Sequence, residues 1–373
     1  MEVALFLTFD YSLKTWDESG TLNRELKIYK KLSESRGIKF KFFTYGNSED
    51  LKYLKIVKNS EIIPIYSNQK ISKYKIIRYL NSFLIPLKLK KHLQSVDLIK
   101  QNQLMGSWVS IICSVLYKKP YYLRSGYDMY QFSIFERKHF SIVGLYKLLT
   151  YFSIKFSNLY SVTSNKDFAF LNTKFSISKK NIVIRPNWVQ RVNIPNKDRF
   201  ENRILCVGRL CYQKNFEYII KEFKNTENIL TLDFVGSGEE ITTLKESAKT
   251  NHVSVNFLDQ MSHSALMNLY PKYKFYITSS LFEGHPKSLL EALSSGCVVF
   301  ASDIISHREI IEDNETGIIF QLKDNSLSEV FMKVKENYDL INKISKNAER
   351  SMNDNYSLEK LIKQTYNDYK SLI

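Results

Sequence analysis

Short apolar runs alternate with segments whose apolar positions recur at helical spacing along most of this 373-residue chain. Several of the runs are almost continuously apolar, as at 232–235 and 297–301, which is typical of parallel strands covered on both faces. The segments between them, such as 23–35 and 216–223, predict helices. This alternation indicates an α/β fold of βαβ units with right-handed crossovers, and therefore doubly wound parallel sheets.

The predicted strands form two groups, separated by Arg185-Pro186-Asn187-Trp188, which we expect to be an interdomain linker. The first group is 3–9, 39–45, 98–100, 121–124, 159–163 and 182–184, and the second is 204–207, 230–235, 253–258, 275–278 and 298–301. We therefore expect one domain at 1–185, a second at 186–352 and a closing segment at 353–373. Within the last segment, 356–373 has the spacing of one amphipathic helix with Ser357 as its N-cap.

Composition excludes several classes of protein. Hydrophobic residues make up 44% and charged residues 25% of the chain, with only 12 Gly and 7 Pro, which indicates a folded globular protein. The four cysteines form no CxxC pair and indicate reduced thiols in a cytoplasm. The apolar run 3–9 lies between Glu2 and Asp10 and suits a buried strand better than a signal peptide, and no apolar stretch reaches the ~18–20 residues that span a bilayer.

The formal net charge is +16, and it is unevenly distributed. Residues 1–185 hold 31 Lys and Arg against 13 Asp and Glu, a balance of +18, whereas residues 186–373 hold 23 against 25, a balance of −2. The first half is therefore expected to attract polyanions, whether nucleic acid, anionic lipid or phosphorylated substrates.

Open parallel sheets bind ligands at the carboxyl ends of their strands, and three strand ends in the second half carry suitable residues. After the strand 204–207 come Arg209 and Lys214, two cations that suit a diphosphate or are simply solvated. After the strand 230–235 come Gly236 and Gly238, which allow close approach of a ligand. Position 241 is Ile rather than the third Gly of a dinucleotide fingerprint, which argues against a nicotinamide cofactor.

The third strand end carries the strongest pattern. It follows 275–278 and contains Glu283 and, eight residues later, Glu291. Pro286 suits the first turn of a helix, which leaves the amides of Ser288 and Leu289 free to bind a phosphate. Two carboxylates with nearby cations fit a sugar nucleotide, whereas the alternative is two solvated glutamates at a helix start.

These three elements, in this order, resemble the family 4 retaining glycosyltransferases of GT-B fold, of the type that assembles bacterial surface polysaccharides. The resemblance rests on Val207-Gly208-Arg209-Leu210 with Lys214, on Val235-Gly236-Ser237-Gly238, and on the E-x7-E spacing of Glu283 and Glu291. It implies two Rossmann-like domains facing a cleft, with the terminal helix returning to the first. It further implies that Arg209 and Lys214 neutralise the donor diphosphate, that Glu291 binds the ribose and that Glu283, the catalytic candidate, contacts the donor sugar.

Such enzymes are hexosyltransferases that need no metal or cofactor, and the chain has no Asp-x-Asp pair. No set of residues for a covalent nucleophile is present, so we expect a front-face displacement. We also expect the two domains to close on each other about Pro186-Asn187. In the first half the likeness is looser: Gly20 ends a loop, 12–20, that resembles the acceptor-side loop. Arg124 either contacts a phosphate or is structural, and His285 and His307 have no assigned role.

Three alternatives remain open: a nucleotide-sugar 2-epimerase, an inactive partner that binds sugar nucleotides, and a nucleic-acid-binding protein, for which no RNP, KH, helix-turn-helix or zinc pattern is present. The expected partners are a nucleotide-sugar donor, a glycan or polyprenyl-diphosphate-linked acceptor and no nucleic acid. Residues 62–96 hold seven basic side chains and no acid among apolar residues: Lys70, Lys73, Lys75, Arg78, Lys88, Lys90 and Lys91. This segment predicts peripheral docking on the anionic inner face of the plasma membrane, or an ordinary solvated helix face.

Overall fold

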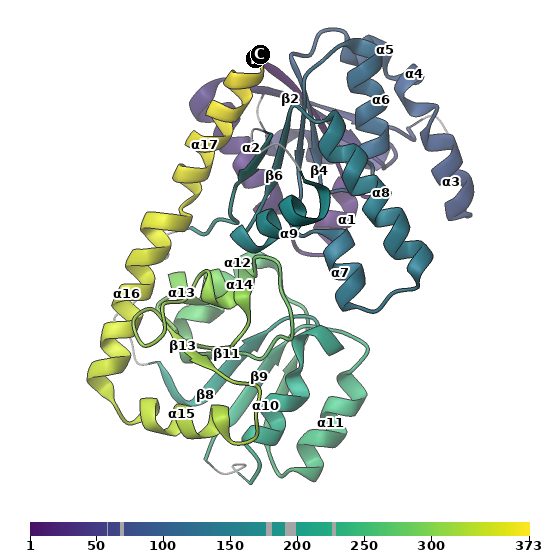
Figure 1. Ribbon diagram of the computed structural model, residues 1–373. Helices are drawn as coiled ribbons and strands as arrows, with labels where there is room; N and C mark the ends of the chain where they lie inside the picture. Colours follow the sequence, from purple (N-terminus) through teal and green to yellow (C-terminus); the bar gives the residue numbers. More distant parts are fainter. Residues whose placement is uncertain (58, 68–70, 177–180, 191–198, 226–228) are drawn as a thin grey trace. The chain divides into compact units, whose positions relative to one another are not determined.

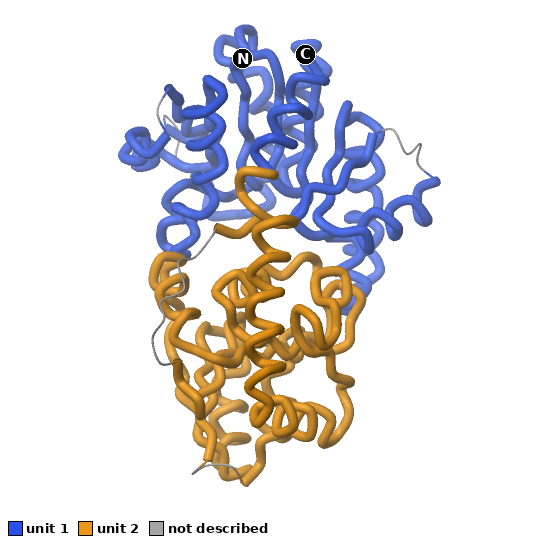
Figure 2. The backbone as a smooth tube through the Cα atoms, turned by 90° about the vertical axis from the view of Figure 1, so that its left-hand side faces the viewer, with its two compact units in different colours: residues 1–186, 361–373 blue, residues 187–360 orange. Residues whose placement is uncertain are grey.

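The chain divides into two compact units, each described by itself (Figure 2). The computed structural model describes residues 1–57, 59–67, 71–176, 181–190, 199–225 and 229–373. Unit 1 is Met1–Pro186 with Leu361–Ile373, and unit 2 is Asn187–Lys360. The boundary falls inside the predicted linker. Position 352, the expected end of the second domain, lies within a helix, and unit 2 continues to Lys360.

Unit 1 is built on a seven-stranded parallel sheet in the order β3-β2-β1-β4-β5-β6-β7 (Figure 1). Its strands are β1 (Glu2–Phe6), β2 (Lys39–Thr44), β3 (Ser60–Pro64), β4 (Leu98–Asn102), β5 (Tyr121–Arg124), β6 (Leu159–Val162) and β7 (Ile182–Ile184). Its helices are α1 (Leu13–Glu18), α2 (Leu22–Arg36), η1 (Ser48–Ile56), α3 (Lys75–Ser82), α4 (Ile85–Lys88), α5 (Lys90–Leu93), α6 (Ser107–Tyr117), α7 (Met129–Phe135), α8 (Phe140–Phe156) and α9 (Asn165–Phe175).

Unit 2 repeats this order with a six-stranded parallel sheet, β10-β9-β8-β11-β12-β13. Its strands are β8 (Phe200–Val207), β9 (Thr231–Val235), β10 (Ser254–Leu258), β11 (Tyr273–Thr278), β12 (Val298–Ser302) and β13 (Ile318–Phe320). Its helices are η2 (Tyr212–Lys214), α10 (Phe216–Glu222), α11 (Ile241–Thr250), α12 (His263–Leu269), η3 (Tyr270–Lys272), α13 (Lys287–Ser294), α14 (Ile305–Arg308), α15 (Ser326–Lys335) and α16 (Tyr338–Tyr356).

Both faces of the unit 2 sheet are buried. Along β12, Val298 and Phe300 pack into one apolar cluster with α10 and α15, while Val299 and Ala301 pack into another with α13 and α16. Successive side chains of a strand point to opposite faces, so a strand covered on both sides needs apolar residues at every position. The prediction of doubly covered parallel strands, and with it the α/β fold class, is confirmed.

The last helix, α17 (Leu358–Leu372), continues from unit 2 into unit 1. Its Asp368 carboxylate accepts hydrogen bonds from Arg185 Nε at 2.7 Å and Nη2 at 2.5 Å. The ring of Tyr369 packs edge-on against that of Tyr122. Ser357 Oγ accepts the Lys360 backbone N–H at 3.4 Å, at the predicted N-cap. Residues 361–373 are therefore part of the packing of unit 1.

Two strands and one helix were not expected. The missed strands, β3 and β13, are edge strands of their sheets and pair on one side only. The loop predicted at 12–20 contains helix α1, which is stabilised by reciprocal capping between Ser12 and Thr15. Gly20 follows this helix with a positive φ of 67° and its N–H donates to Asp17 O. No helix among the described residues combines the length and apolar character needed to cross a membrane.

Candidate functional site

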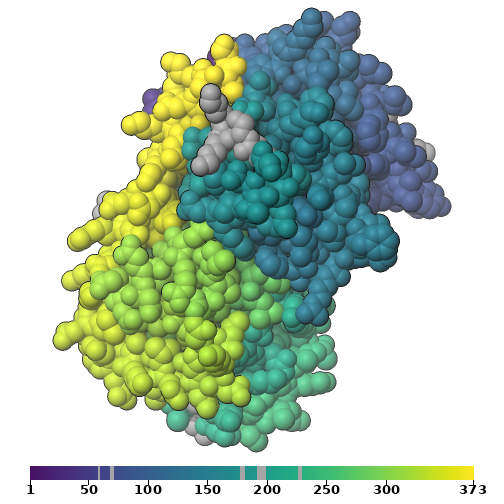
Figure 3. Space-filling model, viewed as in Figure 1, coloured from purple at the N-terminus to yellow at the C-terminus, as the bar shows by residue number. Residues whose placement is uncertain are grey.

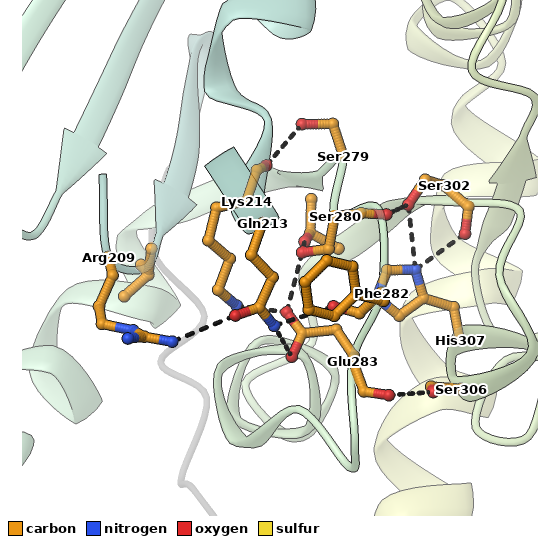
Figure 4. A network of polar contacts seen from close by, with 12 residues as sticks. Arg209, Gln213, Lys214, Ser279, Ser280, Phe282, Glu283, Ser302, Ser306 and His307 are labelled. Atoms are coloured by element: carbon orange, nitrogen blue, oxygen red, sulfur yellow. Dashed lines mark hydrogen bonds and ion pairs between the residues drawn. The ribbon is translucent and has the colours of Figure 1, made fainter. Parts of the chain in front are cut away.

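The loops that follow β8 and β11 meet at one edge of the unit 2 sheet. These two strands are neighbours in the sheet although two other strands separate them along the chain. The connections from neighbouring strands leave in opposite directions at such a point, which opens a crevice at the carboxyl ends. The loop after β8 carries Arg209 and Lys214, and the loop after β11 carries Glu283 (Figure 4).

Glu283 and Lys214 form a largely buried ion pair. The Nζ of Lys214 lies 2.6 Å from Oε1 of Glu283, and the two side chains are 14% and 9% exposed. Ser280 Oγ donates to the same oxygen at 2.8 Å, and Gln213 Nε2 donates to Oε2 at 3.3 Å. Both carboxylate oxygens are thus held in place by residues of the two loops, as Figure 4 shows.

The charge state of Glu283 follows from this environment. Burial alone raises the pKa of its carboxyl, but the charge and hydrogen bond of Lys214 outweigh it and hold the pKa below its ordinary value. The electrostatic interaction with His307 and the hydrogen bond from Ser280 also lower this pKa. Glu283 is therefore a carboxylate at neutral pH, next to a cation.

Arg209 joins this network through Gln213. Its Nη2 donates to Gln213 Oε1 at 3.1 Å, and Gln213 Nε2 also donates to the carbonyl of Phe282 at 2.9 Å. Arg209, Lys214 and Glu283, which the sequence singled out, are therefore brought together. Gln213 was missed, since a glutamine one residue before a lysine carries no signal of its own.

Glu291 has different partners. It lies on α13, and its carboxylate oxygens are 3.1 Å from His263 Nε2 and 3.2 Å from the hydroxyl of Tyr270, which donates to it. His263 is the first residue of α12, which Ser262 caps. Because His263 is 28 residues before Glu291, no local pattern could have predicted the contact.

Helix α13 begins directly after Pro286. Pro286 is its N-cap and Lys287 its first residue, so Ser288 and Leu289 are second and third. The first backbone hydrogen bond runs from the Leu290 amide to Pro286 O, and no side chain caps the helix. The positive end of the helix dipole therefore lies beside the loop that carries Glu283.

The two glycines after β9 have a role in packing. An added Cβ at Gly236 would overlap the carbonyl oxygen of Gly208, and one at Gly238 would overlap that of Leu210. Gly236 also has a φ of 145°. Glycine is needed here because the chain itself approaches closely, whereas we had expected the close approach of a ligand.

Hydroxyl groups brace the loop around Glu283. Ser306 Oγ donates to the carbonyl of Glu283 at 2.6 Å, and Ser302 Oγ donates to that of Ser280 at 2.6 Å (Figure 4). His307 is fully buried on α14 with Nδ1 2.8 Å from Ser302 O, and His285 is buried beside the ring of Tyr356. The two histidines thus have structural surroundings that the sequence did not reveal.

The two candidate residues of unit 1, Gly20 and Arg124, do not line a common pocket. Arg124 Nη1 donates a hydrogen bond to the carbonyl of Arg185 at 2.8 Å. This contact favours a structural role for Arg124 over contact with a phosphate. A pocket of about 260 Å³ lies beyond β1 and β2, where Arg78 on α3 forms an ion pair with Asp10 at 2.9 Å. Neither Gly20 nor Arg124 is among its lining residues. Among the described residues of the whole chain, His, Cys, Asp and Glu do not gather in groups that could hold a metal ion.

Comparisons with known structures identify the fold. A sucrose-phosphate synthase from Thermosynechococcus elongatus superposes with a TM-score of 0.80 at 16% identity, over 100% of this chain and 99% of its own. Anabaena HepE, solved with UDP and glucose, gives 0.76 at 15% identity, over 99% and 100%. The fold is the GT-B fold that the sequence predicted.

Sequence comparisons identify the family of unit 2. The family model "Glycosyl transferases group 1" matches residues 187–351, so unit 2 carries a glycosyltransferase group 1 domain. The GtfA subunit of a UDP-N-acetylglucosamine–peptide N-acetylglucosaminyltransferase from Streptococcus pneumoniae is 29% identical over 31% of this chain and 24% of its own. A Campylobacter jejuni diphospho-undecaprenol 4-alpha-N-acetylgalactosaminyltransferase is 30% identical over 41% of this chain and 44% of its own. The chain thus spans a quarter to under half of these two relatives.

Proposed function

We propose that the protein is a retaining glycosyltransferase of family 4 that moves a hexose from a nucleotide sugar to a glycan acceptor in cell-surface polysaccharide assembly. The observation that carries this proposal is the Lys214–Glu283 pair, linked through Gln213 to Arg209 at the sheet edge of the matched domain. An anion that enters this edge meets two cations and the start of α13, while a sugar next to it meets a fixed carboxylate.

In the proposed reaction, Arg209 and Lys214 neutralise the diphosphate together with the amides of Ser288 and Leu289, and Glu291 holds the ribose. The bond from the anomeric carbon to the diphosphate oxygen breaks as the acceptor hydroxyl adds on the same face, and the departing oxygen takes the hydroxyl proton. Glu283 stabilises the positive charge that develops on the sugar. The chain's own cations stabilise the leaving group, so the proposal requires no metal or cofactor.

We further propose a polyprenyl-diphosphate-linked acceptor and a cytoplasmic enzyme bound to the inner face of the plasma membrane. The acceptor class is that in the name of the Campylobacter relative. The surface lysines of the segment 62–96 support the membrane contact, because Lys73, Lys75, Lys88, Lys90 and Lys91 are exposed. Lys70 lies outside the described residues.

Donor binding and transfer test this function. We expect UDP-, GDP- or ADP-sugars to raise the melting temperature of the protein, and one of them to support transfer to polyprenyl-diphosphate oligosaccharides. Glu291→Ala should abolish both the shift and turnover, whereas Glu246→Ala, an exposed glutamate of α11, should change neither. Wild-type transfer by Glu291→Ala would refute the site, and nucleotide release without any acceptor would indicate an epimerase instead.

A further inference from the structure

Helix α8 of unit 1 exposes a stripe of apolar side chains, while Ile154 and Leu149 on its other side pack in the core of unit 1. Its buried residues are Thr150, Ser153 and Ile154, and Ser153 Oγ donates to Ser107 Oγ of α6 at 2.8 Å. On the other side, Leu145 is 53% and Leu148 55% exposed, and Phe152 and Phe156 continue the same stripe at spacings of four. The exposed side of a surface helix in a globular protein is normally polar.

The charges on α8 are all positive. Lys147 and Lys155 are exposed, and no acidic residue occurs between positions 140 and 156. By their spacing along the helix, both lysines lie on one flank of the apolar stripe, with Lys155 closer to it than Lys147. Lysine side chains beside an apolar surface can extend their ammonium groups toward anions while their stems cover apolar area.

A second exposed apolar helix lies on the same side of unit 1. On α3, Ile76 is 75% and Leu80 62% exposed (Figures 1 and 3 show α3 in blue and α8 in teal). Both helices are tied to α6, since Trp108 Nε1 donates to Ser82 Oγ at 2.8 Å and Ser107 bonds with Ser153. The two helices are thus fixed parts of one unit.

We propose that α8 docks in the interface of an anionic bilayer, with Leu145, Leu148 and Phe152 inserted among the lipid chains and Lys147 and Lys155 at the headgroups. This inference deepens the membrane contact of the proposed function, because it adds the apolar stripe of α8 to the basic segment 62–96. A bilayer offers both a broad apolar phase and negative charge. A second copy of this surface does not, because neither 62–96 nor α8 holds an acidic residue that could pair with the lysines. A bilayer is therefore favoured over such a protein partner.

The helix lies in the plane of the membrane. Its 17 residues span roughly 25 Å, and its Thr150 and Ser153 side remains packed on unit 1. Insertion is therefore limited to one side of the helix. Binding strength should follow the apolar area on that side, with an electrostatic contribution that salt weakens.

Vesicle flotation tests this inference. Vesicles of equal parts phosphatidylglycerol and phosphatidylcholine should bind the wild-type chain, and Leu145→Ser/Leu148→Ser should bind roughly tenfold or more weakly. Lys147→Gln/Lys155→Gln should lose roughly fivefold per lysine on these vesicles only, and nothing on pure phosphatidylcholine. The matched control, Ile229→Ser/Met332→Ser, removes exposed apolar residues of unit 2 and should bind as wild type.

Two outcomes would overturn the inference. One is unchanged vesicle binding by Leu145→Ser/Leu148→Ser. The other is a wild-type chain that ignores vesicles but forms a dimer in sedimentation that this variant loses, which would make the surface a contact between copies. The thermal shift with nucleotide sugars is measured in parallel and should be the same for all variants. A missing shift in the wild type would count against the proposed function, and vesicle binding would still decide the role of α8.

Discussion

Two lysines that are withdrawn from water, Lys214 in unit 2 and Lys100 in unit 1, are stabilised in different ways. Lys214 lies against a carboxylate, with 2.6 Å between Nζ and Glu283 Oε1. Lys100, on β4, is 1% exposed, and its Nζ lies 4.9, 5.5 and 5.6 Å from the ring centroids of Tyr29, Tyr122 and Tyr369. Its Nζ donates a hydrogen bond to the Tyr29 hydroxyl at 3.4 Å.

The difference shows what each region is suited to do. An ion pair at a sheet edge has a fixed geometry and retains hydrogen-bonding capacity for an incoming anion. A cation among aromatic rings gains attraction from the rings but loses most of its hydration. Burial therefore lowers the pKa of Lys100 to about 7, helped by the charge of Arg124 and opposed by that of Asp368. Lys100 thus lies in a core where burial disfavours its charge, whereas Lys214 retains a charge partner at the carboxyl ends of the unit 2 strands.

Removing the cation from the pair should have the largest effect. Lys214→Met leaves Glu283 buried without its charge partner, which should lower the free energy of unfolding by about 3–5 kcal/mol. Urea unfolding measures this loss, and Lys221→Met, an exposed lysine paired with Glu217, should lose less than about 0.5 kcal/mol. A loss no greater than that of the control would show that the pair is not buried in solution.

The same variant should reverse a pH dependence. In the wild type the pKa of Glu283 is lowered, so its contribution to stability is present above its ordinary value of 4.5 and is lost as the pH falls through the lowered value. In Lys214→Met, burial is the largest remaining influence and is opposed only by the weaker effects of His307 and Ser280. The pKa of Glu283 should therefore be raised, so acidification from neutral pH should stabilise the folded state at this residue.

Lys100 should show the next largest effect. Between about pH 7 and its ordinary pKa of 10.5, the unfolded chain holds a proton on this side chain that the folded chain does not. The free energy of unfolding should therefore rise with pH by ~1.4 kcal/mol per unit from this group, or about 3 kcal/mol from pH 7 to 9. Lys100→Met should lack this slope and Lys174→Met should keep it. Parallel pH profiles for the wild type and Lys100→Met would contradict the low pKa.

The smallest effects concern the backbone that supports Lys214. Gly238→Ala should cost roughly 1–3 kcal/mol in thermal or urea unfolding, because its Cβ meets the rigid carbonyl of Leu210. Gly208→Ala should cost less than about 1 kcal/mol, because its Cβ meets the flexible stem of Lys214, 3.1 Å from Cε. Equal losses in the two variants would mean that both loops adjust in the same way.

The sequence predicted those parts of the fold and site that depend on local patterns. Eleven of the strands and the order of the three motifs follow from apolar runs and from residue types at strand ends. Strands β3 and β13 were not predicted, although the other two edge strands, β7 and β10, were. The contact of His263 with Glu291 could not be predicted from the sequence, because it joins segments that are far apart along the chain. Helix α8 has an apolar pattern that is normally assigned to a core, and only the packing of the folded chain shows that Leu145 and Leu148 are exposed.

The return of α17 to unit 1 also has a consequence for biosynthesis. Tyr369, one of the three rings around Lys100, is added to the chain 247 residues after Tyr122, another of them. A nascent chain on the ribosome can complete unit 2 first, although it is encoded later, because unit 2 is continuous in sequence and unit 1 is not. Until residues 361–373 emerge, Lys100 lacks the ring of Tyr369, and the packing of unit 1 is incomplete.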